Sequence, residues 1–282
     1  MTTGEQRLSA VSGGPLIAVD VWLGRPLFSM SALWAVIAGA LITLPAGSSL
    51  SDLGRQLVLA VLLADVLWGN LWAVLTTRDG LTLRRGYPLI RLPYLRPESP
   101  AAHLLGWSVN GGDGAVSWQA IVLLAILAAI ISALIGVPAM ALSAAALLAC
   151  LIGWALDRSG GHYWARWMQA LVEFGFPWML GAWAVSGRME LWWLGMTFCV
   201  WYRAGLARGS GERTADLLLL VSQVLALAAL IWLRSPISAV FVALGIIVPW
   251  WQAARADGQW TTAHGQGWWW IALMGSALAL AV

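Results

Sequence analysis

The chain has 282 residues, of which 60% are hydrophobic and 10% charged, and its mean hydropathy is +0.78. A soluble domain carries about 25% charged residues, so the composition excludes a soluble globular protein and indicates a polytopic membrane protein. All 16 basic residues are arginine, which excludes P-loop ATPases, protein kinases and Schiff-base enzymes because each needs a lysine. The net charge of +3 is attributed to loops at the membrane surface, so no nucleic-acid partner is expected.

Nine apolar stretches are candidates to cross a bilayer, whose hydrocarbon core of about 30 Å needs roughly 20 helical residues. In chain order they lie near 27–45, 56–77, 117–136, 138–156, 167–186, 190–206, 215–233, 236–253 and 267–282. The third and fourth belong to one long apolar stretch, which we divide at Gly136-Val137-Pro138 because proline favours the first turn of a new helix. The expected fold is an all-α bundle of nine transmembrane helices. Residues 1–26 are expected to form a cytoplasmic or interfacial segment, and residues 27–282 a single transmembrane domain.

The positions of the arginines predict the orientation, because cytoplasmic loops of membrane proteins are enriched in basic residues. With the N-terminus inside, thirteen arginines fall on the inner side and only Arg55, Arg188 and Arg234 on the outer side. The chain is therefore expected in the cytoplasmic (inner) membrane, with its N-terminus in the cytoplasm and its C-terminus outside. Two cytosolic loops are conspicuous: 78–116 for its length, arginines and prolines, and 203–215 for its glycines and charges.

Two carboxylates lie within the predicted spans, Asp65 in the second and Glu173 in the fifth. A carboxylate at the centre of a membrane helix costs about 2.5–3.5 kcal/mol on insertion scales, so each needs a partner or a wet cavity. On a regular helix Asp65 shares a face with Trp72, and Gln169 shares one with Glu173. These residues indicate either a ligand or proton cavity, or structural carboxylates that hold helices together, and both alternatives stay open.

Several short features match one known family. Gly24-Arg25-Pro26 precedes a first span that contains Trp34-Ala35 and Gly39-Ala40, and Gly211-Glu212-Arg213 follows the sixth span. Together with nine spans and conspicuous cytosolic loops after the second and sixth, they resemble the UbiA superfamily of intramembrane prenyltransferases. The first feature is similar to the opening of the chlorophyll and bacteriochlorophyll synthase branch. The second resembles the Gly-Asp-Arg that closes the family's second motif, with glutamate in place of aspartate.

The resemblance implies two Asp-rich motifs whose Mg²⁺ ions hold an isoprenyl diphosphate. The first motif has the form Asn-Asp-x-x-Asp-x-x-x-Asp. If Asn70 is its asparagine, the three aspartate positions hold Leu71, Val74 and Arg78. In the second motif Gly205 and Ser210 stand where carboxylates are expected. Apolar and cationic groups cannot hold Mg²⁺, so the resemblance implies a catalytically degenerate relative.

Two functions follow from this resemblance. The first is an accessory subunit, or a binder of an isoprenoid, quinone or (bacterio)chlorophyll-type lipid, with partner subunits in a membrane complex such as a photosynthetic one. The second is an active Mg-dependent prenyltransferase with non-standard metal ligands. A transporter or an unrelated structural subunit is a third alternative. The two halves of the sequence show no evident internal repeat, which counts against a transporter.

The candidate site residues form three groups. A diphosphate or other ligand would be bound by Asn70, Arg84, Arg85 and Arg213. A cavity would be lined by Asp65, Trp72, Gln169 and Glu173. If the protein is an active enzyme, Mg²⁺ would be held by Asp79, Glu212 and Asp216.

Overall fold

The computed structural model describes residues 31–44, 50–76, 118–187, 191–209, 211–212, 214–255 and 262–281. All regular structure in these ranges is helical and forms nine continuous runs, which confirms the predicted all-α class for this part of the chain. The runs are α1 (Ser31–Ile42); α2, η3 and α3 (Leu50–Val61, Leu62–Trp68 and Gly69–Thr76); α5 (Trp118–Ile135); α6 (Val137–Arg158); α7, η4 and α8 (His162–Ala170, Leu171–Gly175 and Phe176–Ser186); α9 (Trp192–Gly209); α10 (Ala215–Trp232); α11 (Pro236–Arg255); and α12 (Thr262–Ala281). The predicted N-terminal segment 1–26 and loop 78–116 lie outside the described residues.

The long apolar stretch divides where the sequence predicts it. Helix α5 ends at Ile135 and α6 begins at Val137, with Pro138 in its first turn. Between them Gly136 has a φ of +136°, a backbone conformation that glycine adopts without a steric penalty. The glycine breaks one helix and the proline starts the next.

The connection after α9 is shorter than the predicted loop 203–215, because α9 continues to Gly209 and α10 begins at Ala215. Alanine, leucine and arginine in this stretch are all good helix formers. Gly211, with a φ of +72°, donates its N–H to the Arg208 carbonyl, and Glu212 donates to the Ala207 carbonyl, both at 3.1 Å. These two hydrogen bonds are the pair that closes a Schellman motif. The Gly-Glu pair of the family-like motif is thus a helix C-cap here.

Two helical runs contain a wide, π-helical turn. In η3 the N–H of Gly69 donates to the Ala64 carbonyl, and in η4 the N–H of Phe176 donates to the Leu171 carbonyl, each five residues apart. Such turns are rare and occur often at functional sites. Each of these two turns carries the carboxylate of its span, Asp65 in η3 and Glu173 in η4.

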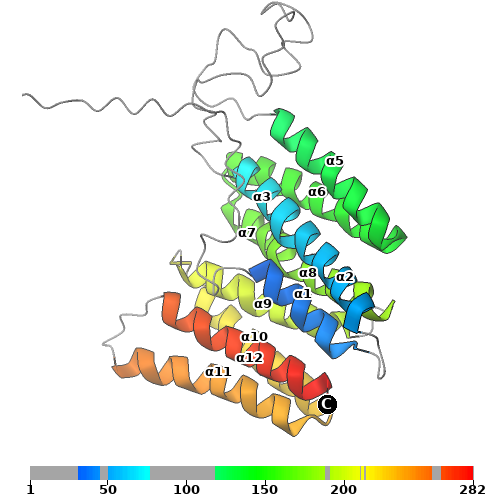
Figure 1. Cartoon of the computed structure of the whole chain (residues 1–282). Helices are drawn as coiled ribbons and strands as arrows, with labels where there is room; N and C mark the ends of the chain where they lie inside the picture. Colours follow the sequence, from blue (N-terminus) through cyan, green and yellow to red (C-terminus); the bar gives the residue numbers. More distant parts are fainter. Residues whose placement is uncertain are drawn as a thin grey trace, which may run out of the picture.

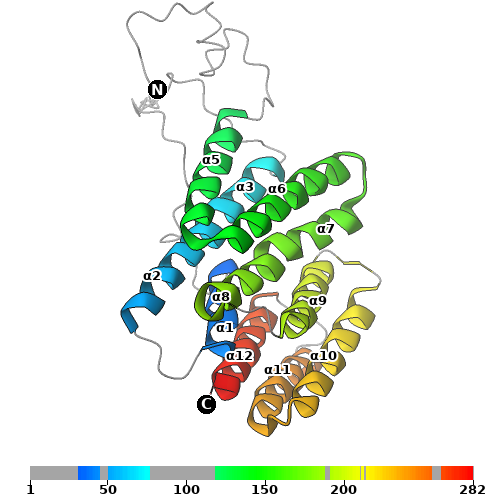
Figure 2. The same cartoon turned by 90° about the vertical axis from the view of Figure 1, so that its right-hand side faces the viewer.

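Helices α1 and α8 lie at the centre of the bundle. Figure 1 shows α5 and α6 along one flank, α11 and α12 along the opposite flank, and α1 and α8 between them; Figure 2 shows the same order. Both central helices contribute side chains to each of the two buried apolar clusters. Gly39 of α1 and Gly181 of α8 allow the close approach, since a Cβ on Gly39 would fall on the Trp178 carbonyl and one on Gly181 on the Val36 carbonyl. Small residues bring membrane helices together in this way.

The outer surface of the bundle is apolar. Within the described residues, three helical stretches are long and apolar enough to cross a membrane: Gly54–Ala73, Val137–Arg158 and Ala215–Trp232. Large apolar side chains point outward from α5, α6, α10 and α11, among them Ile130, Leu134, Val137, Leu148, Leu217, Ile231, Ile237 and Ile247. A soluble monomer rarely exposes contiguous apolar surface of this kind. The architecture therefore fits a membrane protein.

Most of the described arginines gather at one end of the bundle. Successive helices alternate in direction, so α6, α9 and α11 end where α7 and α10 begin (Figure 1). This end, which we call the arginine end, carries Arg158, Arg166, Arg203, Arg208 and Arg255. Among the described arginines only Arg55 and Arg234 lie at the other end.

Candidate functional site

The two π-helical turns bring the carboxylates of Asp65 and Glu173 into the same region of the bundle. Segments η3 and η4 pack against each other, and Asp65 and Glu173 are both half-buried. Sequence reasoning placed these residues on separate spans and offered a cavity between the two spans as one of its alternatives. The structure brings their turns together in the interior of the helical bundle.

Glu173 is hydrogen-bonded by neutral donors from two helices. Nε2 of Gln169 lies 3.2 Å from each carboxylate oxygen, so the predicted pairing along one helix face is observed. The hydroxyl of Tyr202 on α9 donates to Oε2 at 2.6 Å, a length typical of a hydrogen bond to a charged oxygen. These contacts give the carboxylate the partners that it needs away from water.

Aromatic rings pack against Tyr202 in this polar group, which we call the Glu173 cluster (Gln169, Glu173 and Tyr202). The Tyr202 ring stacks on Phe174 with a centroid distance of 6.1 Å and lies 5.4 Å from Trp269. Trp269 contacts Trp270 at 4.4 Å, and Trp270 contacts Trp34 of α1 at 5.8 Å. The Tyr202 ring thus lies against aromatic rings of η4 and α12, and the chain of ring contacts continues to α1.

Trp72 and Asn70 have local packing contacts. A Cβ on Gly153 would lie 2.5 Å from Cη2 and Cζ3 of Trp72, so this indole fills the space between α3 and α6. The side-chain amide of Asn70 donates to the Val66 carbonyl in its own helix. The predicted shared face of Asp65 and Trp72 assumes a regular α-helix. The wide turn of η3 lies between the two residues, so α-helical spacing does not apply there.

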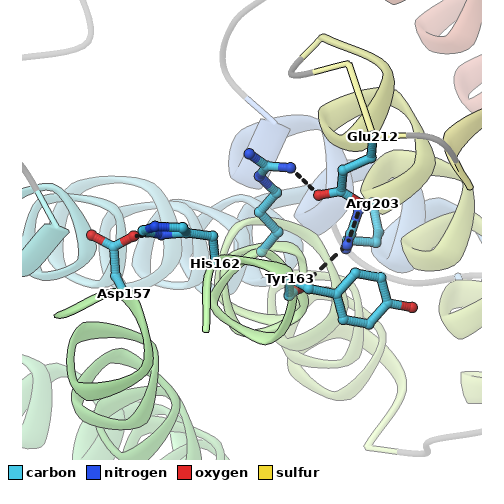
Figure 3. Close-up of polar contacts among 6 residues, drawn as sticks. Asp157, His162, Tyr163, Arg203 and Glu212 are labelled. Atoms are coloured by element: carbon cyan, nitrogen blue, oxygen red, sulfur yellow. Dashed lines mark hydrogen bonds and ion pairs between the residues drawn. The ribbon is translucent and has the colours of Figure 1, made fainter. Parts of the chain in front are cut away.

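A second polar group, the Glu212 network (Arg166, Arg203 and Glu212), lies at the arginine end (Figure 3). Oε1 of Glu212 pairs with Nη1 of Arg166 from α7, and Oε2 lies 3.0 Å from Nη2 of Arg203 from α9. Arg203 is 0% exposed, donates to the Tyr163 carbonyl at 3.2 Å, and stacks over the rings of Tyr163 and Trp167 at 4.8 and 5.5 Å. The network joins α7, α9 and the connection to α10.

The described members of the predicted metal group pair with arginines. Glu212 has both oxygens on guanidinium groups, and Asp216, which is 67% exposed, lies 3.2 Å from Nε of Arg208. Two cations on one carboxylate oppose the binding of a further cation. Within the ranges that the structure describes, no group of three His, Cys, Asp or Glu residues could hold a metal ion. Asp79, Arg84, Arg85 and Arg213 lie outside these ranges.

Sequence reasoning missed two functional candidates, Tyr202 and Arg203. Both lie on α9, 29 residues or more from the residues of α7 and η4 to which they donate hydrogen bonds. The available signal was a tyrosine and an arginine within the helix-forming stretch 192–209. A polar residue in a largely apolar helix indicates a buried polar contact, but it does not indicate which residues of other helices make that contact.

No protein-family model, curated protein or solved structure matches the chain. The resemblance to the UbiA superfamily stays a hypothesis that rests on the sequence features alone. The two polar groups described above therefore carry the functional argument.

Proposed function

We propose that the protein spans the cytoplasmic membrane nine times and binds a lipid of the isoprenoid, quinone or (bacterio)chlorophyll type, as an accessory subunit of a membrane complex. The observation that carries this proposal is the Glu173 cluster, a hydrogen-bonding group whose tyrosine packs against aromatic rings. Such a site suits an amphiphile with a polar, flat head and an apolar tail. The proposal assigns the protein a binding role without prenyl transfer.

The chemistry of the Glu173 cluster supports such a ligand. The Tyr202 hydroxyl and the Gln169 amide both donate to Glu173, and either donor can turn to a carbonyl oxygen of a quinone or tetrapyrrole head. The neighbouring Phe174 and Trp269 rings offer faces for stacking against a conjugated ring. Ligand sites of this kind combine apolar walls with a few placed polar groups.

The Glu212 network argues against prenyl transfer by the family mechanism. Departure of a diphosphate develops negative charge, which the family stabilises with Mg²⁺ and carboxylates. Here Glu212 has both oxygens paired with arginines, and Leu71 and Gly205 offer no side-chain oxygen at the matched positions. A carboxylate whose two oxygens both contact guanidinium groups opposes the binding of a further cation.

The proposal is tested by purifying the full-length protein from its native membrane in mild detergent and identifying bound lipids and partner subunits by mass spectrometry. We expect one prenylated or pigment lipid at near-equimolar yield, with a large loss in Tyr202→Phe. The matched control is Tyr163→Phe. This substitution removes a hydroxyl from a residue that is 43% exposed and keeps the ring under Arg203. Bulk phospholipid alone in the wild-type protein would overturn the proposal.

A further inference from the structure

Among the residues that the structure describes at the arginine end, guanidinium groups outnumber the carboxylates that they contact. Three guanidinium groups, those of Arg166, Arg203 and Arg208, face two carboxylates, those of Glu212 and Asp216. Asp216 pairs with Arg208, at 3.2 Å from its Nε. The excess therefore lies on Arg166 and Arg203, which share the single carboxylate of Glu212.

Arg203 has hydrogen-bond acceptors for only one of its three nitrogen atoms among the described residues. Its Nη2 has two, the Glu212 carboxylate and the Tyr163 carbonyl, whereas Nε and Nη1 are buried with no partner among the described residues. Unsatisfied buried donors on a charged group are unfavourable. Among the described residues, the site thus has fewer acceptor oxygens than Arg203 has donors.

We propose that the arginine end binds a phosphate-type oxyanion in the place that the Glu212 carboxylate occupies, between Arg166 and Arg203. Guanidinium groups recognise carboxylates and phosphates with the same planar set of donors, so Glu212 acts as the protein's own substitute for the anion. A phosphate monoester carries more charge and more oxygens than a carboxylate. It can neutralise both arginines and reach donors of Arg203 that Glu212 leaves unpaired.

The position of Glu212 makes exchange with an external anion feasible. Glu212 is 18% exposed and Arg166 27% exposed, and Glu212 contributes to the cap of α9 through its backbone N–H and not through its side chain. Its side chain can therefore move without disturbing a helix. Arg203 is held in place by the rings of Tyr163 and Trp167, so it keeps its orientation when the anion changes.

This site is independent of the lipid-binding function, because it uses none of the residues of the Glu173 cluster. The phosphate can come from solution or from a lipid headgroup at the membrane surface. We expect Tyr202→Phe to leave phosphate binding unchanged, which separates the two proposals experimentally.

The test measures binding of inorganic phosphate to the full-length protein in detergent, and of phosphatidic acid in nanodiscs with diacylglycerol as the uncharged control. Glu212→Gln keeps the side-chain shape and removes the competing charge, so we expect about tenfold tighter binding. Arg166→Gln should weaken binding by about tenfold, since one of the two guanidinium groups is lost. Binding of phosphate in solution indicates a free anion, and binding of phosphatidic acid alone indicates a headgroup.

Asp216→Asn is the matched control, because it changes the net charge as Glu212→Gln does but at an exposed pair, where solvent screens the effect. We expect less than about a twofold change in phosphate affinity. Equal effects of the two substitutions, or unchanged affinity in Glu212→Gln, would overturn the proposal. If Glu212→Gln fails to give a monodisperse protein, the phosphate affinity of Arg166→Gln is the test. An affinity equal to that of the wild-type protein would also overturn the proposed phosphate site.

Discussion

Glu173 and Glu212 differ in the kind of partner that each carboxylate has. Glu173 receives hydrogen bonds from the neutral side chains of Gln169 and Tyr202, whereas Glu212 is paired with two arginines. The Gln169–Glu173 contact could be predicted because both residues lie on one helix at a spacing of four. The other contacts join separate helices, and no spacing rule on a single sequence indicates which helices are neighbours.

The hydrogen bond from Tyr202 is expected to stabilise the bundle. Tyr202→Phe leaves a Glu173 oxygen without its closest donor, so we expect the free energy of unfolding to fall by about 1.5–3 kcal/mol, the usual range for a hydrogen bond to a charged group. Reversible denaturation in detergent measures this change. Tyr163→Phe is the control and should be within about 0.5 kcal/mol of wild type. Equal stability of Tyr202→Phe and wild type would contradict the assigned contact.

The contacts at position 203 are expected to require the planar guanidinium group of arginine and not only a positive charge. Lysine keeps the charge but cannot reproduce the planar donors that serve Glu212 and Tyr163 or the stacking on the ring of Trp167. We expect Arg203→Lys to lower the unfolding free energy by at least about 1.5 kcal/mol. Arg255→Lys, at an exposed arginine that lies over Trp251, should change it little. A thermal melt of both variants distinguishes these outcomes.

At the scale of single helices, sequence signals predicted some boundaries well. The break between α5 and α6 follows from Gly136 and Pro138, whose backbone preferences are local. The wide turns η3 and η4 could not be predicted in this way. Helical periodicity assumes one spacing throughout, and an intramembrane carboxylate marks a functional candidate without specifying a change of helix type.

The approach of α1 to α8 gives a prediction at this scale. Gly181→Ala places a Cβ on the Val36 carbonyl, so the two central helices must move apart, and we expect a loss of about 1–3 kcal/mol. Gly205→Ala is the matched control, because nothing lies within 4 Å of its added Cβ on α9. There the better helix propensity of alanine should leave stability equal or slightly higher. Comparable melting temperatures for the two variants would contradict the described packing.

For the whole molecule, composition and apolar run length predicted the class of fold and the nine helical runs. The arrangement of the runs could not be predicted, because it depends on contacts such as those of Gly39 and Gly181 between distant helices. The thirteen-to-three distribution of arginines predicted the topology. The described arginines agree in part, since five of them share one end of the bundle.

The orientation can be tested with single cysteines at the two ends. Cys150 and Cys199 are buried, so a membrane-impermeant thiol reagent should leave the parent protein unlabelled. In intact cells we expect Ala281→Cys to be labelled and Ser159→Cys, at the arginine end, to be protected until the membrane is opened. The reverse pattern would contradict the predicted topology.

The claim that the protein does not transfer prenyl groups is tested most directly by incubating the purified protein with Mg²⁺, geranylgeranyl diphosphate and a chlorophyllide or aromatic acceptor, and following the donor and any prenylated product by mass spectrometry. We predict that the donor is recovered unchanged and that no prenylated product forms. Metal-dependent product that forms over many turnovers and disappears in Glu212→Gln would contradict the binding role and establish the alternative, an active prenyltransferase with Glu212 as a metal ligand.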